Sequence, residues 1–167
     1  MKEYKCTLCN EIKPENLFYK NGKKNVNRTI RGECKKCSSI NTSKYMNTEE
    51  GFMKKLYSSM KDRQKIIKRS FSHIVELSLE EFLELWQKYK KKYGIICFYT
   101  GVKLDFIKKA GRGTQVSVDR IDNNEGYTKN NIIFCSARAN FEKHSVSIDM
   151  CRKILALYEE RQGLTKE

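Results

Sequence analysis

Hydrophobic residues recur at helical spacing through the middle of the chain. One predicted helix carries Phe52, Leu56 and Tyr57 along a single side. A second begins at Ser78, because the run Ser-Leu-Glu-Glu forms a capping box, with a serine followed three residues later by a glutamate. The apolar side of this second helix consists of Phe82, Leu85, Trp86 and Tyr89. The pattern predicts a mainly helical segment over residues 46–92.

The last third of the chain has shorter apolar runs, which are typical of strands. Three such runs are predicted strands: residues 95–99, 116–120 and 131–134. One helix is predicted to begin near Ser136 and a last helix after Ser147. We therefore expect an α+β fold in which residues 93–167 form one segment.

Four cysteines near the N-terminus predict a structural zinc site. Cys6 and Cys9 form one C-x2-C pair, and Cys34 and Cys37 form a second pair 24 residues further on. Each pair presents two thiolates to one ion, and two pairs complete a tetrahedron. Four thiolates leave no open position, so this Zn²⁺ is expected to fold residues 1–45 rather than to do chemistry.

Charge points to nucleic acid as the partner. The net charge is +14, and residues 20–70 hold fifteen basic and four acidic residues, so 15 − 4 = +11 of the excess lies there. Such a field attracts polyanions, although it does not separate DNA from RNA, or binding from cutting. The N-terminus lacks a signal-like apolar stretch, and no apolar run has the length of a membrane span. A cytoplasmic protein with no membrane partner is expected, in a bacterial or phage-infected cell.

The stretch VDRIDNNEGYTKNNIIFCSARANFEKHS at 118–145 carries the chemistry. It resembles the signature of the HNH (ββα-metal) endonuclease family, in which two strands and a helix hold one divalent ion. The resemblance implies that Asp119 and Asn140 bind Mg²⁺ or another divalent ion, and that Asn131 fixes the loop. Carboxylate and amide oxygens suit a hard ion of this kind. His144, one helical turn after Asn140, is a candidate third ligand.

Arg120 departs from the family pattern, which places a histidine general base directly after the acid. Arginine stays protonated in proteins and cannot accept a proton. Three interpretations remain open. The chain is an inactive DNA-binding protein, or the base is His73 or His144, or the nucleophile is not water.

Tyr99 is the candidate for a nucleophile other than water. The Asp–Arg pair and the N-terminal zinc site resemble those of a rare-cutting restriction endonuclease within this family, which uses a tyrosine nucleophile. Matching that enzyme places Tyr99, in the turn over residues 97–101, at the reactive position. Core packing is the alternative interpretation of this tyrosine. If it is the nucleophile, Arg120 is a candidate to stabilise the phenolate or the growing phosphate charge.

Other residues are interpreted as structural. Gly126 is assigned to the loop and Tyr127 to packing beneath it, while Cys135 and Cys151 are expected in the core. The similar enzyme holds a second zinc with four cysteines, of which only Cys97 has a counterpart here. The three other positions of that site are Thr100, Ser136 and Ala139. A second zinc is therefore not expected.

The resemblance implies a metal-dependent double-strand DNA endonuclease, restriction- or homing-like. A symmetric homodimer that cuts a palindromic site would use one small subunit once per strand. Trp86 and Phe82 would then serve either the dimer interface or the core. Two alternatives remain: a non-catalytic DNA-binding zinc protein, and a DNA junction resolvase of the endonuclease VII type.

Overall fold

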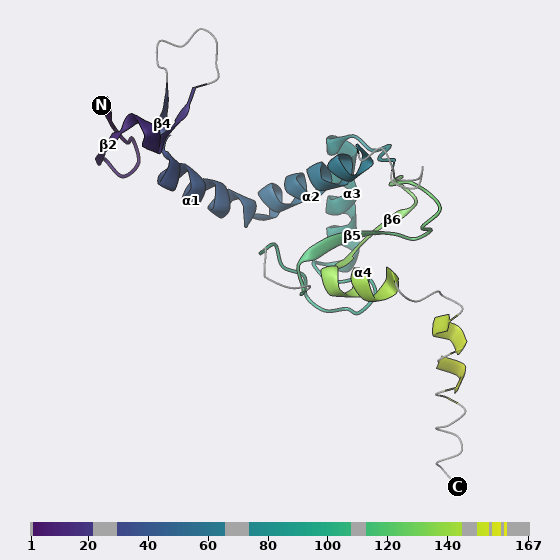
Figure 1. Cartoon of the computed structure of the whole chain (residues 1–167). Helices are drawn as coiled ribbons and strands as arrows, with labels where there is room; N and C mark the ends of the chain where they lie inside the picture. Colours follow the sequence, from purple (N-terminus) through teal and green to yellow (C-terminus); the bar gives the residue numbers. More distant parts are fainter. Residues whose placement is uncertain are drawn as a thin grey trace. The chain divides into compact units, whose positions relative to one another are not determined.

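The computed structural model describes most of the chain in two units (Figure 1). The described residues are 2–21, 30–65, 74–107, 113–144, 150–153, 155–157 and 159. Unit 1 is Met1–Phe52 and unit 2 is Met53–Glu167. The division falls inside helix α2 (Glu49–Gln64). Each unit is described by itself.

Unit 1 consists of two short hairpins and a helix. The first hairpin pairs β1 (Glu3–Lys5) with β2 (Ile12–Pro14), and a 3-10 turn, η1, follows over Glu15–Leu17. The second pairs β3 with β4, and α1 begins directly after it. These last three elements are β3 (Phe18–Lys20), β4 (Ile30–Cys34) and α1 (Lys35–Met46).

The core of unit 1 is very small. Its buried members are two apolar side chains, Phe18 and Ile30, and two cysteines, Cys6 and Cys34. None of the twelve residues of α1 is buried. A core of this size does not offset the conformational entropy lost on folding, so the unit requires another source of stability.

Unit 2 is built on an antiparallel hairpin, two helices that precede it and one that follows. The elements after α2 are α3 (Leu79–Tyr93), β5 (Val116–Arg120), β6 (Ile132–Ser136) and α4 (Ala137–His144). The strands β5 and β6 run side by side, and α4 packs against both (Figure 1). The strands predicted over 116–120 and 131–134 and the helix predicted near Ser136 are therefore confirmed, with β6 displaced by one to two residues.

The α3 helix begins and packs as the sequence predicted. Ser78 accepts a hydrogen bond from the Glu81 backbone at 3.1 Å, and the Glu81 carboxylate accepts one from the Ser78 backbone at 2.9 Å, which completes the capping box. The buried side of α3 meets Phe134 of β6. Ring centroids lie 5.0 Å from Phe134 for Trp86, 5.3 Å for Tyr89 and 5.7 Å for Phe82. These aromatic residues form the core of unit 2.

Two expectations for residues 93–167 are wrong. The first is the strand predicted over residues 95–99, which does not form. Ile96 makes one isolated bridge to Lys103, and a tight turn follows in which the Gly101 backbone donates to the Cys97 carbonyl at 2.9 Å. Gly101 has φ 68°, a left-handed conformation that glycine adopts at little cost. Cys151 is exposed, whereas Cys135 is buried as expected.

The predicted last helix is described only in part. Residues 150–153, 155–157 and 159 are helical, and its predicted start after Ser147 lies outside the described residues. In the part of the chain that the structure describes, no helix is both long enough and apolar enough to span a membrane.

Gly126 is required by a close approach of two backbone segments. The Tyr127 backbone donates to the Ile74 carbonyl at 2.7 Å, and Tyr127 is buried beneath the β5–β6 loop. A Cβ at Gly126 would lie 2.6 Å from the same carbonyl oxygen. The structural roles expected for Gly126 and Tyr127 agree with this geometry.

We expect Gly126→Ala to destabilise unit 2 by about 1–3 kcal/mol, because the backbone must shift to admit the methyl group. Urea unfolding followed by tryptophan fluorescence measures the change. Gly113→Ala is the matched control, since a Cβ there has no neighbour within 4 Å. That variant should differ from wild type by less than about 1 kcal/mol. Equal effects of the two substitutions would contradict the steric explanation.

Candidate functional site

The four N-terminal cysteines converge on one point. Their sulfur atoms all lie within 4.8 Å of one another. Cys6 precedes a turn after β1, Cys9 closes that turn, Cys34 ends β4 and Cys37 lies in the first turn of α1. The structure therefore brings together the four residues that the sequence predicted as a metal site.

Backbone hydrogen bonds hold the sulfur of Cys6 in place. The Cys34 backbone N–H donates to Cys6 Sγ at 3.3 Å, and the Leu8 N–H donates to it at 3.5 Å. The turn closes through Asn10, whose N–H donates to the Cys6 carbonyl at 3.0 Å and whose φ is 59°. Asparagine tolerates this left-handed conformation better than most residues. The hairpin thus presents Cys6 with its sulfur already supported.

These contacts favour a charged cluster. The Cys34 backbone hydrogen bond is the main cause that lowers the pKa of Cys6 to about 6. A side-chain hydrogen bond with Cys34 is the main cause that raises the pKa of Cys37 to about 12, and burial raises it further. Lys13 lies close by with its pKa raised, chiefly by its ion pair to Glu11 at 2.7 Å and further by nearby cysteines. A divalent ion would replace the remaining protons, and Zn²⁺ suits four sulfur donors.

In unit 2, Tyr99 and Asp119 are in direct contact. The Tyr99 hydroxyl donates to Asp119 Oδ2 at 2.6 Å. Asp119 on β5 is buried, and although 40% of Tyr99 is exposed, its hydroxyl end lies against that carboxylate. Burial raises the pKa of Tyr99, and the hydrogen bond to Asp119 raises it further. At neutral pH the phenol therefore keeps its proton and shares it with the carboxylate.

Lys143 completes this cluster, and the sequence reasoning missed it. Its Nζ lies 2.7 Å from Asp119 Oδ2, donates to the Arg120 carbonyl at 2.8 Å and is 5.8 Å from the centre of the Tyr99 ring. Lys143 follows Asn140 by three residues on α4, so the two side chains share one side of the helix. That spacing could have identified it. The lysine supplies the positive charge that a buried carboxylate requires.

Asn140 of α4 contacts β5 at Val118, the residue directly before Asp119. Its amide nitrogen donates to the Val118 carbonyl at 3.0 Å and to Ser117 Oγ at 2.8 Å. The amide oxygen is therefore directed to the other side of the group. One carboxylate and one amide oxygen fit the donor preference of Mg²⁺, which commonly takes few protein ligands and completes its shell with water and phosphate.

The guanidinium of Arg120 contacts the β5–β6 loop. Successive side chains of a strand point to opposite faces, so Arg120 lies on the face away from Asp119. Its guanidinium donates to the carbonyls of Asn123 at 3.2 Å and Glu125 at 3.1 Å, and stacks 5.4 Å from the centre of the Tyr127 ring. The Arg120 side chain therefore stabilises the β5–β6 loop. The cation beside the Tyr99 ring is Lys143.

Asn131 bridges the same loop. Its amide nitrogen donates to the carbonyls of Asp122 and Gly126, both at 2.9 Å, and its oxygen accepts from the Asp122 N–H at 2.7 Å. These are the hydrogen bonds expected of a loop-fixing residue. The loop therefore has two anchors, Asn131 from within and Arg120 from β5.

The side chains of the two candidate histidines lie outside the described part of the structure. His73 is not among the described residues, and His144 is the last residue of α4 but its side chain is not described.

Cys97 lies at the start of the turn over residues 97–101. Burial alone would raise the pKa of Cys97, but hydrogen bonds with Thr100 and Ser136 lower it overall. Of the other positions matched to a second zinc site, Thr100 and Ser136 offer hydroxyls in place of thiolates, and Ala139 offers no ligand atom.

A mostly apolar cavity of about 630 Å³ opens beside Tyr99. Phe98 and Ile121 line it together with Tyr99, and Glu142 and Lys143 of α4 bring charge to it. The nucleophile candidate is therefore reachable from the surface.

No protein-family model matches this chain, and no curated protein matches it either.

Proposed function

We propose that this chain is a DNA endonuclease of the HNH type that cuts by attack of Tyr99 on a phosphodiester. The observation that carries the proposal is the hydrogen bond of 2.6 Å from the Tyr99 hydroxyl to the buried carboxylate of Asp119. A nucleophile paired with a base in this way is typical of covalent catalysis. The β5–β6 hairpin and α4 support it, since Lys143 of α4 pairs with Asp119 and Asn140 of α4 donates to the carbonyl of the adjacent Val118.

In the proposed step the phenolic oxygen of Tyr99 forms a bond to phosphorus as the bond from phosphorus to a sugar oxygen breaks. The phenolic proton passes to Asp119, and the departing sugar oxygen takes a proton from water. Because the pKa of Tyr99 is raised, deprotonation accompanies attack rather than preceding it. Lys143 lies beside the ring and the carboxylate, where its charge stabilises the extra negative charge of the transition state.

Asp119 and Asn140 would hold the divalent ion, whose chemistry is to polarise the phosphate oxygens. The amide nitrogen of Asn140 donates to Val118 and Ser117 of β5, so its amide oxygen is the donor available to the ion. The role of the chain is to orient that oxygen and the carboxylate.

The concentrated positive charge supports nucleic acid as the substrate, and the resemblance to HNH endonucleases makes DNA the proposed one. Of the net charge of +14, +11 lies in residues 20–70, outside the β5–β6–α4 region that holds the cluster. Binding and cutting are thus assigned to different segments. Cutting both strands of a duplex requires two active sites, and we propose a symmetric homodimer to supply them.

A plasmid assay tests this function. Supercoiled DNA with Mg²⁺ should be nicked and linearised by the wild-type protein, and Asp119→Asn should lower the rate by at least about 10²-fold while duplex binding stays within a few-fold of wild type. The exposed Asp62→Asn on α2 is the control for the same change of charge. A gel shift without any cutting by the wild type would instead support a DNA-binding protein that is not an enzyme.

A further inference from the structure

Unit 1 carries an exposed tyrosine with two cations above its ring. Tyr19 on β3 is 44% exposed. The guanidinium carbon of Arg31 lies 5.6 Å from the ring centre, and Lys35 Nζ lies 5.7 Å from it. Both distances are within the range of cation–π attraction, which holds flexible cationic side chains in place.

The fold brings these three residues together from three elements. Tyr19 lies in β3 between Phe18, which pairs with Cys34, and Lys20, which pairs with Ile30. Arg31 lies on the partner strand β4, and the pairing is irregular at Tyr19. Lys35 is the first residue of α1, directly after the metal-ligand candidate Cys34. The zinc site therefore sets the position of the cations relative to the ring.

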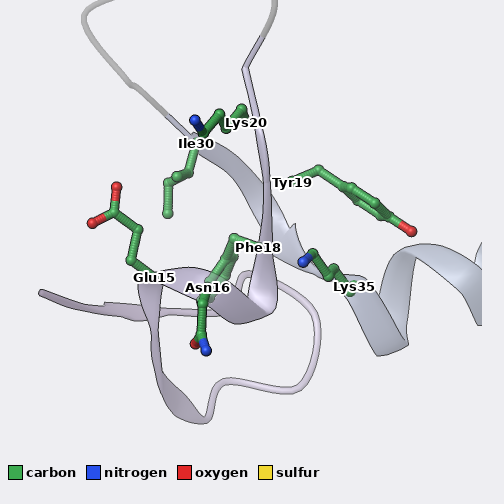
Figure 2. Close-up of a pocket in the computed structure, with 7 residues that line it drawn as sticks. All are labelled: Glu15, Asn16, Phe18, Tyr19, Lys20, Ile30 and Lys35. Atoms are coloured by element: carbon green, nitrogen blue, oxygen red, sulfur yellow. The ribbon is translucent and has the colours of Figure 1, made fainter. Parts of the chain in front are cut away.

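A cavity of about 600 Å³ lies beside this group (Figure 2). Its lining residues are Glu15, Asn16, Phe18, Tyr19, Lys20, Ile30 and Lys35. Tyr19 and Lys35 lie on one side, and the carboxylate of Glu15 lies on the other. Within the described part of the chain, neither Arg31 nor Lys35 forms an ion pair. Among the described residues, these two positive charges therefore lack an internal counter-ion.

We propose that Arg31 and Lys35, positioned by the Tyr19 ring, bind the phosphate backbone of duplex DNA. This inference rests on the proposed function and assigns the anchoring of the substrate to unit 1. Phosphate is the chemistry that two cations of this kind recognise, the guanidinium through its fork of donors and the ammonium as a point charge.

The surrounding sequence agrees with a backbone contact. Residues 20–31 contain five basic residues and no acidic residue. Duplex DNA presents about one negative charge per 1.7 Å of its axis. The basic residues of 20–31, which include Arg31, together with Lys35 complement this row of phosphates in charge. A contact of this kind carries affinity and register but no base sequence.

Duplex binding by the full-length zinc-loaded protein, measured against salt concentration, tests the proposal. For the double variant Arg31→Gln/Lys35→Gln we expect affinity at about 0.1 M salt to fall on the order of tenfold per lost contact, and the salt slope to fall by about 2. Tyr19→Leu keeps both charges but loses the ring, so it should lower affinity less than the double variant. Tyr19→Phe keeps the ring and should bind as wild type does. Zinc content and circular dichroism confirm that each variant is folded.

Lys44→Gln is the matched control, because Lys44 is an exposed lysine of the same helix, nine residues after Lys35. A loss for Lys44→Gln as large as that for Lys35→Gln alone would overturn the proposal in favour of diffuse charge. So would an unchanged affinity in the double variant, or a loss confined to RNA duplexes. The proposed function fails separately, if the wild-type protein neither binds nor cuts duplex DNA.

Discussion

We expect a Tyr99→Phe variant to fold and to bind duplex DNA but not to cut it. The substitution removes one oxygen and keeps the ring that packs against Phe98, whose centroid lies 5.5 Å away. Stability changes little, since the lost hydrogen bond to Asp119 leaves that carboxylate paired with Lys143 at 2.7 Å. Cleavage falls by at least about 10³-fold, because without a nucleophile the chain retains only binding and electrostatic stabilisation. Plasmid cleavage with Mg²⁺, beside a gel-shift measurement, gives both quantities.

Tyr93→Phe is the matched control. Tyr93 is also part-exposed, at 39%, and its ring lies 6.0 Å from that of Phe98, on the other side of the same aromatic group. This variant should cut normally. A wild-type reaction quenched rapidly and run on a denaturing gel should contain a covalent DNA–protein adduct, which Tyr99→Phe lacks. Normal cutting by Tyr99→Phe would make water the nucleophile and leave Tyr99 a packing residue.

We expect removal of zinc to unfold unit 1 and to leave unit 2 folded. The core of unit 1 consists of Phe18 and Ile30 with two cysteines, which is too little apolar surface to fold without a metal. Unit 2 has its own aromatic core around Trp86 and Phe134. A strong chelator, or the substitution Cys34→Ser, should therefore abolish hydrogen-exchange protection in residues 1–52 and retain it in α3. Elemental analysis of the wild type should give one zinc per chain.

Cys151→Ser provides the control for this second expectation. Cys151 is an exposed thiol in the last helical segment, remote in sequence from the four-cysteine cluster. The variant should keep its zinc and its full protection. Two tightly bound zinc ions per wild-type chain would contradict the single site, and protected amides in the zinc-free unit 1 would show that the small core is sufficient.

Local patterns predicted the elements that depend on local physics. The two C-x2-C pairs, the capping box at Ser78 and the alternation in 116–120 each specify a conformation within a few residues, and each is present in the structure. The run 95–99 failed because apolar content alone does not make a strand. Cys97 is buried there as part of a turn closed by Gly101, and the turn places Tyr99.

The candidate site depends on pairings that one stretch of sequence does not contain. Tyr99 and Asp119 are 20 residues apart, and Lys143 is 24 residues beyond Asp119. The role of Arg120 came from the resemblance of the Asp–Arg pair to another enzyme, whereas the structure places its guanidinium on the β5–β6 loop. The two-residue period of a strand and the three-residue spacing from Asn140 to Lys143 would have added Lys143 as the cation beside Asp119.

The position of Cys34 couples metal binding at the proposed zinc site to the formation of helix α1. Cys34 ends β4, serves as the N-cap residue of α1 and belongs to the four-sulfur cluster. An isolated helix of twelve residues is marginal in water, and α1 buries none of its own side chains. We therefore expect nucleation of α1 to depend on a metal bound by Cys34 and Cys37. The helicity of α1 should then report the fraction of chains that carry zinc, and Lys35 should be ordered only in that fraction.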